Sequence, residues 1–383
     1  SFITRVCEGT LEYRIYIDYV IDSFSKVSVN KMKPQIREIL RSAVYQLKFM
    51  DSVPDSAVCN EAVKLAQRKG FYNLKPFVNG VLRTIAREIG DLELPSREEN
   101  EVRYLSVKYS MPEYLVEKWK AAYGVKTTEK ILEDFLTERP ITVRCRTHKA
   151  SLREIVTSLK SQGVTVEQAP YLPYALKISD YNHILTLETF LQGKILVQDV
   201  SSMLVAEAAS PKKGDHIIDM CAAPGGKSIH AADKMGDYGN VDARDVSQYK
   251  ADLIKENIHR TGVINVESRV QDATVYDPDS EQAADIVIAK KPEIKYRATP
   301  QKQEEIVMLQ RMILDKAAKY VKPDGTLIFS TCTIAREENE ENVLWFLKNY
   351  PYRLESLDPY IPEELHCKST KLGYLQLLPG IHK

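Results

Sequence analysis

The chain has 383 residues, more than a single hydrophobic core usually organises, so we expect two or three domains. Hydrophobic residues make up 44% and charged residues 28%, the usual proportions of a globular protein. The 53 basic residues balance 53 acidic ones, which argues against a uniformly cationic coat for nucleic acid but permits a locally basic, RNA-binding surface.

The six cysteines are scattered along the chain. None forms a CxxC pair or a cluster with histidine at metal-ligand spacing, which argues against a zinc site and against a disulfide framework. No apolar run approaches the roughly 20 residues that a membrane helix needs. We therefore expect a monomeric cytoplasmic protein with reduced cysteines, without a metal and without a membrane segment.

Residues 1–92 show helical periodicity and a mild excess of basic over acidic side chains. "PQIREILRSAVYQLKFM" begins with Pro34, which suits the first turn of a helix. Two later segments, "SAVCNEAVKLAQRKG" and "LKPFVNGVLRTIAREIG", each end on the glycine that commonly terminates a helix. These patterns predict a small all-α bundle over 1–92.

Residues 93–195 are expected to form a linker followed by a small α+β module. The polar stretch from Asp91 to Tyr104, interrupted by Pro95, is typical of a linker. Beyond it "PEYLVEKWKAAYG" predicts a helix and "ITVRCRTHKAS" a strand, while "SLREIVTSLKSQGVTVEQAP" predicts a helix followed by a strand.

Residues 196–383 alternate strand and helix patterns. The predicted strands are 216–220, 238–244, 266–271, 285–289 and 325–331. Such alternation indicates βαβ units and a mostly parallel, doubly wound α/β sheet of Rossmann-like type. The predicted fold class is therefore multidomain: all-α, then α+β, then α/β.

The stretch "DMCAAPGGKS", Asp219 to Ser228, follows the first strand of that sheet. A turn of small residues there lets a ligand approach the backbone, and the helix behind it favours negative charge. A phosphate-binding loop needs G-x-x-x-x-G-K-[ST], but Cys221 stands where the first glycine is required. The dinucleotide fingerprint GxGxxG is also absent.

Two acids follow the second and third predicted strands. Asp245 in "VDARDVS" could accept hydrogen bonds from a ribose or could cap the helix that starts near Ser247. Asp272 in "VQDAT" allows the same two interpretations. Together with the glycine turn after the first strand, the pair favours an adenosine-containing ligand.

Cys332 in "FSTCTI" follows the fifth predicted strand. Most cysteines at strand ends are small buried hydrophobic residues, but one on the same sheet edge as a ligand-binding turn could be a nucleophile. The acids in the following "REENEEN" are expected to be ordinary first-turn residues that complement a helix dipole, and we assign them no chemistry.

These segments resemble the S-adenosylmethionine-dependent RNA cytosine-5 methyltransferases of the Nop/Sun family. The amino-terminal helices resemble the NusB-like domain of the RsmB branch, whose members methylate a cytosine in 16S rRNA of the small subunit. The segments that carry the resemblance are "QDVSSM", "DMCAAPGGKS", "ARDVSQYKADLIKENI", "KPDGTLIFSTCT", "EENEENV", "FITRVCEGTLEYRIYIDYVI" and "PFVNGVLRTIARE".

The resemblance implies a covalent mechanism in which Cys332 adds to C6 of the cytosine. It also implies S-adenosyl-L-methionine as the cofactor, with Asp245 at its ribose and Asp272 near its adenine. The target base would have to be unpaired, and the helical domain and middle module would hold the surrounding RNA. The residues implied to wrap the cofactor are Cys221, Ala222, Ala223, Pro224, Gly225, Gly226 and Lys227.

The chain departs from the family at one place. Family members carry an Asp-x-Pro-Cys motif after the fourth strand, whereas "DIVIA" here runs directly into "KKPEIKYR". One explanation, which we favour, is that a loop of the natural protein is missing from this sequence between Ala289 and Lys290. The other is a true deletion, which would make the protein a catalytically inactive rRNA-binding or assembly factor.

Overall fold

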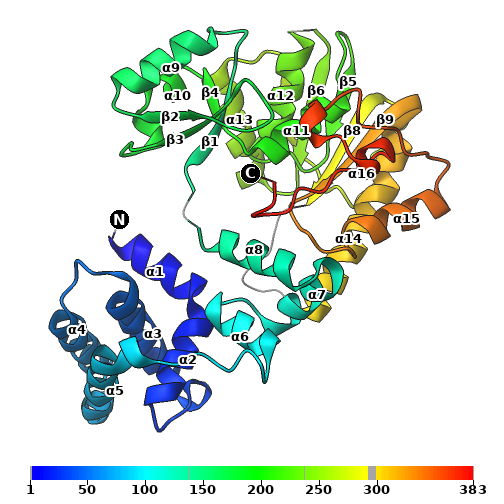
Figure 1. Cartoon of the computed structure of the whole chain (residues 1–383). Coiled ribbons are helices and arrows are strands. Elements are labelled where there is room, and N and C mark those ends of the chain that lie inside the picture. Colours follow the sequence, from blue (N-terminus) through cyan, green and yellow to red (C-terminus); the bar gives the residue numbers. More distant parts are fainter. Residues whose placement is uncertain (1, 138, 237, 292–298, 383) are drawn as a thin grey trace. The chain divides into compact units, whose positions relative to one another are not determined.

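The computed structural model describes residues 2–137, 139–236, 238–291 and 299–382 (Figure 1). These residues form two compact units, which are described separately below. Unit 1 comprises residues 2–137 and 379–382, and unit 2 comprises residues 139–378.

Unit 1 is helical, as the periodicity predicts. The apolar side chains of its first five helices meet in one core that includes the fully buried Ile17, Leu40, Val44 and Leu82. The predicted all-α bundle is therefore confirmed. The helices of the unit are α1 (Phe2–Glu12), α2 (Arg14–Phe24), α3 (Pro34–Phe49), α4 (Asp55–Arg68), α5 (Lys75–Glu88), α6 (Glu101–Lys108), α7 (Glu113–Tyr123) and α8 (Val125–Phe135).

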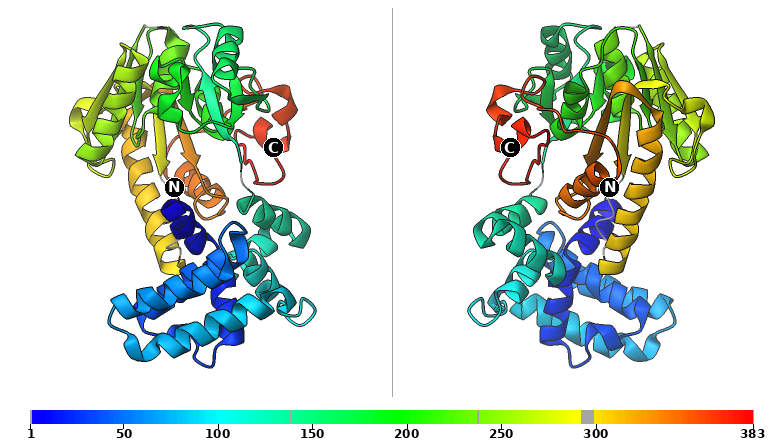
Figure 2. Two further views of the ribbon diagram at one scale, coloured as in Figure 1. Left: turned by 90° about the vertical axis from the view of Figure 1, so that its left-hand side faces the viewer. Right: turned by 90° about the vertical axis from the view of Figure 1, so that its right-hand side faces the viewer.

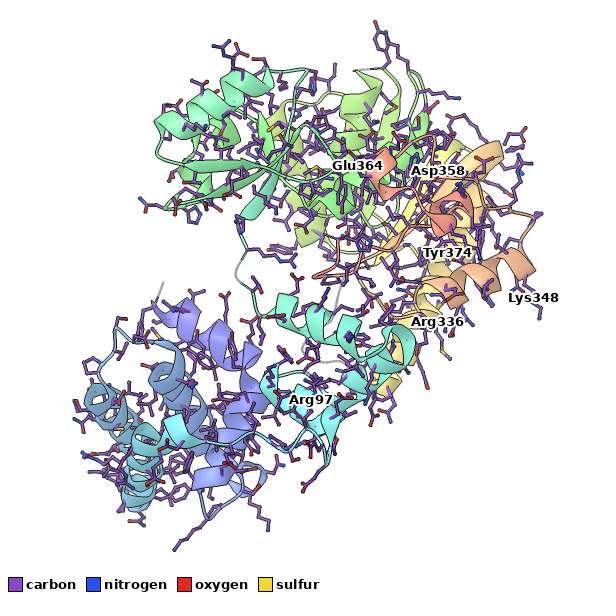
Figure 3. The ribbon with its side chains drawn as sticks, in the orientation of Figure 1. Arg97, Arg336, Lys348, Asp358, Glu364 and Tyr374 are labelled. Carbon is purple, nitrogen blue, oxygen red and sulfur yellow. The ribbon has the colours of Figure 1, made fainter. Side chains whose placement is uncertain are left out.

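The predicted linker is wrong at its carboxyl end, because α6 begins inside it. The side chain of Asn100 caps this helix by accepting a hydrogen bond from the backbone N–H of Arg103 at 2.9 Å. Arg97, labelled in Figure 3, pairs with Glu101 at 3.2 Å and with Glu129 of α8 at 3.0 Å. The polar residues that indicated a linker thus cap α6 and form ion pairs with α6 and α8.

Residues 93–195 divide between the two units, since α6 to α8 belong to unit 1 and the strands of the segment belong to unit 2. Helix α8 was not predicted. The domain boundaries at residues 92 and 195 stay predictions.

The first sheet of unit 2 is antiparallel and has the strand order β2-β3-β1-β4. Its core side chains include Val143 and Ile178 from the sheet and Ile155 and Leu159 from α9. The predicted α+β character is confirmed, although β3 and β4 were not predicted. The elements are β1 (Ile141–Cys145), α9 (Leu152–Ser161), β2 (Thr165–Gln168), β3 (Ala175–Ser179), α10 (Glu188–Leu191) and β4 (Ile195–Val197).

The second sheet of unit 2 is parallel throughout, with the strand order β7-β6-β5-β8-β9. The predicted α/β alternation is confirmed. The strands are β5 (His216–Asp219), β6 (Asn240–Asp245), β7 (Val266–Val270), β8 (Ala284–Lys291) and β9 (Val321–Thr331), and the helices are α11 (Val200–Ala209), α12 (Gly226–Met235), α13 (Gln248–Thr261), α14 (Pro300–Tyr320), α15 (Glu340–Asn349) and α16 (Lys368–Lys371).

Alternate residues of these strands enter two separate cores, as the period of two in a β-strand requires. Ile217 and Ile288 face the core that contains α12 and α13. Their neighbours Ile218 and Val287 face the core that contains α14 and α15. Figures 1 and 2 show these helices on the two faces of the sheet. Because both faces are covered, the central strand β8 carries a continuous apolar run from Ile286 to Ala289.

Strand β8 is longer than predicted. The sequence joins Ala289 directly to Lys290, and the strand continues through both lysines, with Lys290 opposite Ser330 and Lys291 opposite Thr331 of β9. The next seven residues, 292–298, lie outside the described residues, so most of "KKPEIKYR" has no structural account.

A buried ionic junction joins the two sheets of unit 2. Asp233 of α12 accepts from Arg144 at 2.7 Å and from Arg146 at 2.6 Å, and all three side chains are almost fully buried. Burial alone would raise the pKa of Asp233, but the hydrogen bond from Arg146 and the charges of both arginines outweigh it and lower the pKa. Arg146 also donates to the carbonyl of Thr261 at 2.6 Å, at the end of α13.

Replacing Asp233 by Ala should lower the free energy of unfolding of unit 2 by about 3–5 kcal/mol, because two buried guanidinium groups lose their counterion. Since the pKa of Asp233 is depressed in the folded state, this contribution is complete near neutral pH and is lost as the pH falls through the folded pKa. Urea unfolding measures the effect. In the control, Asp252→Ala removes an exposed acid 3.8 Å from Lys255 and should cost less than about 1 kcal/mol. Equal losses in the two variants would contradict the assignment.

Candidate active site

The turn after β5 lies between the ends of two neighbouring strands. The backbone N–H of Met220 donates to the carbonyl of Ile288 in β8 at 3.0 Å, and the N–H of Ala222 donates to the carbonyl of Arg244 in β6 at 2.8 Å. Helix α12 begins directly behind the turn, at Gly226. The predicted ligand-binding turn is thus held at the carboxyl edge of the sheet.

Gly225 is required by the geometry of this turn. Its φ of 100° lies in the left-handed region, and a Cβ atom there would come within 3.3 Å of Ile254 in α13. Position 225 therefore requires glycine both for its backbone conformation and for its close packing against α13.

Asp245 lies against the same turn. Its carboxylate is buried and accepts from the backbone N–H of Ala223 at 3.0 Å, while Lys250 lies 3.0 Å away. The alternative role as helix cap is wrong, because Ser247 caps α13 by accepting from the N–H of Lys250. The structure therefore brings Asp245 to the predicted ligand site.

Asp272 reaches the same edge of the sheet but bonds locally. The N–H of Gln271 donates to the carbonyl of Asp245 at 2.9 Å, which places Asp272 next to that strand end. Its Oδ1 accepts from the backbone N–H and the hydroxyl of Thr274, at 2.8 and 2.7 Å. A role at an adenine stays a prediction.

Asp219 was not predicted as a site residue, yet its buried carboxylate lies at the end of β5, directly before the turn. It is about 1% exposed, and burial raises its pKa. Oδ2 accepts a hydrogen bond from the hydroxyl of Ser228 at 2.7 Å. Oδ1 is buried and makes no hydrogen bond of standard geometry with the residues that the structure describes. Such an orphaned oxygen beside a turn of small residues suits a polar ligand group.

Lys227 is a buried cation at this edge. Its ammonium donates to the hydroxyl of Ser202 in α11 at 2.8 Å, a partner that was not predicted. Burial and the neighbouring charge of Lys290 lower the pKa of Lys227 to about 8, while Asp219 and the Cys332 thiolate oppose the shift. Lys227 follows β5 and Cys332 follows β9, and the parallel register through β8 brings the ends of both strands to the same edge of the sheet.

The two cysteines of the site have different environments. Cys221 lies in the turn, where burial and the charges of Asp219 and Asp245 raise the pKa of its thiol to about 12. Cys332 is exposed and follows Thr331 at the end of β9. Because the thiolate is the reactive form, Cys332 is the better candidate nucleophile. It is not the buried hydrophobic residue of the alternative interpretation.

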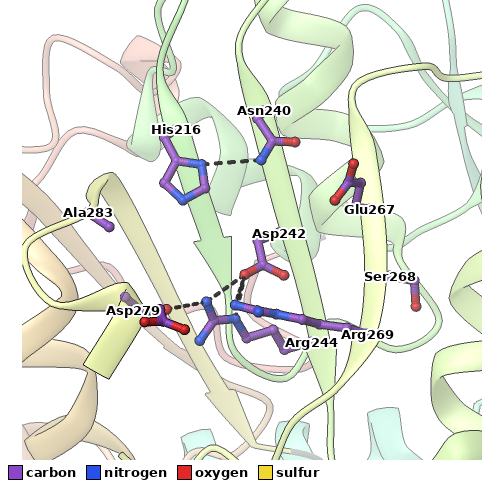
Figure 4. A pocket seen from close by; sticks show the side chains of 10 residues that line it. His216, Asn240, Asp242, Arg244, Glu267, Ser268, Arg269, Asp279 and Ala283 are labelled. Atoms are coloured by element: carbon purple, nitrogen blue, oxygen red, sulfur yellow. Dashed lines mark hydrogen bonds and ion pairs between the residues drawn. The ribbon is translucent and has the colours of Figure 1, made fainter. Parts of the chain in front are cut away.

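A cavity of about 240 Å³ lies at the other end of the sheet (Figure 4). It is lined by the first residues of β5 and β6, His216 and Asn240. Three of its charged side chains form ion pairs: Asp242 lies 2.5 Å from both Arg244 and Arg269. This hollow holds an ion-pair network and lies away from the turn.

Comparison with known proteins identifies each part of the chain. A family model described as 16S rRNA methyltransferase RsmB/F matches residues 206–383. A NusB family model matches residues 1–87, and the ferredoxin-like domain of RsmF/B-like methyltransferases matches residues 111–184.

Full-length relatives agree with these matches. A probable ribosomal RNA small subunit methyltransferase B of Bacillus subtilis is 35% identical over 99% of this chain and 87% of its own length. The chain belongs to the RsmB/F family of 16S rRNA methyltransferases. A second such protein, from Synechocystis, is 29% identical over 100% of this chain and 88% of its own length. The crystal structure of PH0851 covers 100% of this chain and 87% of its own, with 30% identity and a TM-score of 0.82.

The family confirms the resemblance and the fold class predicted from the sequence, and with them S-adenosyl-L-methionine as the cofactor. The small-residue turn, the orphaned Asp219 oxygen and the buried Asp245 fit such a molecule. The alignment to the Bacillus subtilis protein spans 395 positions, more than the 383 residues of this chain. That relative therefore has residues at places where this chain has none.

In the described part of the chain, none of the helices combines the length and apolar character that crossing a membrane requires. No group of three or more His, Cys, Asp or Glu side chains is placed there to hold a metal ion.

The buried Lys227 should make stability depend on alkaline pH. Its pKa in the folded state, about 8, lies below the ordinary lysine value, so the folded protein is penalised while the ammonium is charged and is relieved as the pH rises above 8. Between pH 7.5 and 9.5 the relief should be about 2 kcal/mol in urea unfolding. Lys227→Met should lack this rise, whereas an identical pH dependence in both proteins would contradict the assignment.

Asp245→Asn should weaken S-adenosylmethionine binding by about 10-fold or more, because a charge-assisted hydrogen bond to a ribose hydroxyl becomes a neutral one. Isothermal titration calorimetry gives the Kd directly. The matched control is Asp252→Asn, an exposed acid on α13, which should bind as the wild type does. Unchanged affinity in Asp245→Asn would rule out its predicted contact.

Proposed function

We propose that the protein transfers a methyl group from S-adenosylmethionine to C5 of a cytosine in 16S rRNA through a covalent bond between Cys332 and C6. The observation that carries this proposal is the exposed Cys332 at the same sheet edge as the turn and Lys227. Membership in a family of 16S rRNA methyltransferases supports the substrate class.

The turn from Cys221 to Lys227, together with Asp219 and Asp245, would hold the cofactor. When bound, this cofactor supplies an electrophilic methyl group on a sulfonium. The Oδ1 of Asp219 would face its polar parts. Asp245 would accept hydrogen bonds from its ribose, and Asp272 would lie near its adenine.

Cysteine addition solves a chemical problem at cytosine, because C5 of the intact ring is too weak a nucleophile to attack a sulfonium methyl. When the Cys332 sulfur bonds to C6, the electron pair of the C5–C6 double bond becomes available at C5, which then takes the methyl group. Loss of the C5 proton to a base and breakage of the C6–S bond restore the double bond and free the thiol.

The reaction requires an accessible cytosine, because the C6 atom of a nucleobase that is stacked inside an RNA helix cannot be reached by the thiol. The substrate is therefore expected to be an unpaired cytosine in rRNA or in a partial subunit, held by phosphate contacts to the helical domain and the middle module. Such a substrate implies a cytoplasmic location. The predicted monomeric state stays a prediction.

The second candidate function is an rRNA-binding or assembly factor without catalysis. It is favoured by one observation: β8 ends on Lys290 and Lys291, where the family has Asp-x-Pro-Cys. The extra aligned positions of the Bacillus subtilis relative agree with a segment missing from this sequence. A variant with an Asp-x-Pro-Cys loop inserted between Ala289 and Lys290 distinguishes the two candidate functions. Binding of RNA and cofactor without transfer, before and after insertion, would favour the binding factor.

Cys332→Ala should reduce methyl transfer to an unmodified 16S rRNA fragment by at least about 1,000-fold, because the covalent path is closed. Transfer of radiolabelled methyl groups measures the rate, and calorimetry should show unchanged cofactor affinity. Cys367→Ala, which removes another exposed thiol, is the matched control and should keep wild-type activity. Full transfer by the Cys332 variant would eliminate the proposed mechanism.

A further inference from the structure

We propose that Asn339 is a positioning residue that holds the Cys332 loop from both sides; this inference rests on the proposed function of Cys332. The hydroxyl of Thr331 donates to Oδ1 of Asn339, and Nδ2 of Asn339 donates to the carbonyl of Thr333 at 2.9 Å. One amide side chain therefore bonds the residues immediately before and after the cysteine.

The chemistry of the partners fixes the orientation of this amide. The carbonyl of Thr333 can only accept a hydrogen bond, so the group that faces it must be the NH₂ of Asn339. The oxygen of the amide then faces the hydroxyl of Thr331, which can donate. The reverse orientation would place two acceptors together at Thr333.

The position of Asn339 makes this arrangement unusual. It is the residue before α15, where an asparagine side chain normally accepts a hydrogen bond from the first turn of the helix. Here the side chain makes no capping hydrogen bond to α15, and the φ and ψ angles are −107° and −93°. The amide is turned away from its own helix and toward the Cys332 loop.

Buried polar contacts with α14 anchor the segment that carries Asn339. Asn342 is fully buried, and its Nδ2 donates to Oε1 of Gln310 at 2.7 Å. Gln310 in turn donates to a carboxylate oxygen of Glu338 at 2.9 Å, and Arg311 donates to Oδ1 of Asn342 at 2.9 Å. Because α14 packs in the core of the sheet, Asn339 is tied to a rigid element.

The two hydrogen bonds that join Asn339 to Thr331 and Thr333, called the clamp below, also explain how an exposed cysteine can have a defined position. Cys332 lies in a loop at the surface, where a free chain would move its sulfur over several ångströms. Fixing Thr331 and Thr333 limits that motion without covering the thiol. A nucleophile misplaced by about 1 Å can lose a factor of roughly 100 in rate, so the clamp should matter for the chemical step.

The test compares Asn339→Ala and Thr331→Val with wild type. Each variant should lower kcat by about 10- to 100-fold while KM for the RNA fragment and Kd for S-adenosylmethionine stay unchanged. Their double variant should lose no more than about the larger single loss, since both break one clamp. Asn339→Asp keeps the acceptor for Thr331 but places a second acceptor against the Thr333 carbonyl, so it should lose at least as much activity as Asn339→Ala.

Hydrogen–deuterium exchange tests the same clamp and does not depend on enzymatic activity. Peptides that contain Cys332 should exchange faster in Asn339→Ala, while the rest of unit 2 is unchanged. Asn349→Ala is the matched control, because its amide donates to the carbonyl of Trp345 at the far end of α15, and it should alter neither readout. Wild-type exchange, or faster exchange with wild-type kcat, would overturn the positioning role. An inactive wild type, or an active Cys332→Ala variant, would instead overturn the proposed function. In that case the exchange measurement alone would decide whether Asn339 holds the Cys332 loop.

Discussion

The parallel register of β5, β6, β8 and β9 is the constraint on which the site depends. Asp219 lies opposite Ile288 of β8, and Ala289 lies opposite Phe329 of β9. Strands in such register end at one edge, so residues more than 100 positions apart in the sequence meet there. A shift by one residue would exchange the two faces of a strand and move its apolar side chains out of their cores.

Burial then gives two thiols at this edge opposite characters. Cys221 lies in the turn beside Asp219 and Asp245, and its raised pKa keeps it protonated near neutral pH. Cys332 is exposed and follows the end of β9 at the same edge of the sheet. The division of roles follows from environment: one cysteine shapes the binding turn, and the other is available for chemistry.

The same contrast between buried and exposed groups explains how much the sequence could predict. The parallel sheet was predictable because strand and helix patterns alternate along residues 196–383, with apolar runs in strands such as β8. Helix α6 was not, because Asn100 and its polar neighbours have the composition of a linker, and only the capping hydrogen bond distinguishes them. Excluding Asp245 as the helix cap needed the fold, since sequence alone left that alternative equally open.

Residues that act through long-range contacts were the least predictable. Ser202 meets Lys227 across 25 positions of sequence, and no local pattern indicates that pairing. Asn339 stands among acids that have the composition of an ordinary helix start, and we assigned them no chemistry. A signal was available in hindsight: an asparagine before a helix, seven residues after a candidate nucleophile, is close enough to fold back on it.

The covalent bond between Cys332 and cytosine is the central claim, and trapping it tests the account most directly. An rRNA fragment with 5-fluorocytidine at the target position should leave a stable protein–RNA adduct in the presence of S-adenosylmethionine, because fluorine at C5 cannot be lost as a proton is. Mass spectrometry of the digested adduct should place the bond on the Cys332 sulfur. Attachment at another cysteine, or methyl transfer to unmodified RNA without any adduct on the fluorinated fragment, would contradict the account.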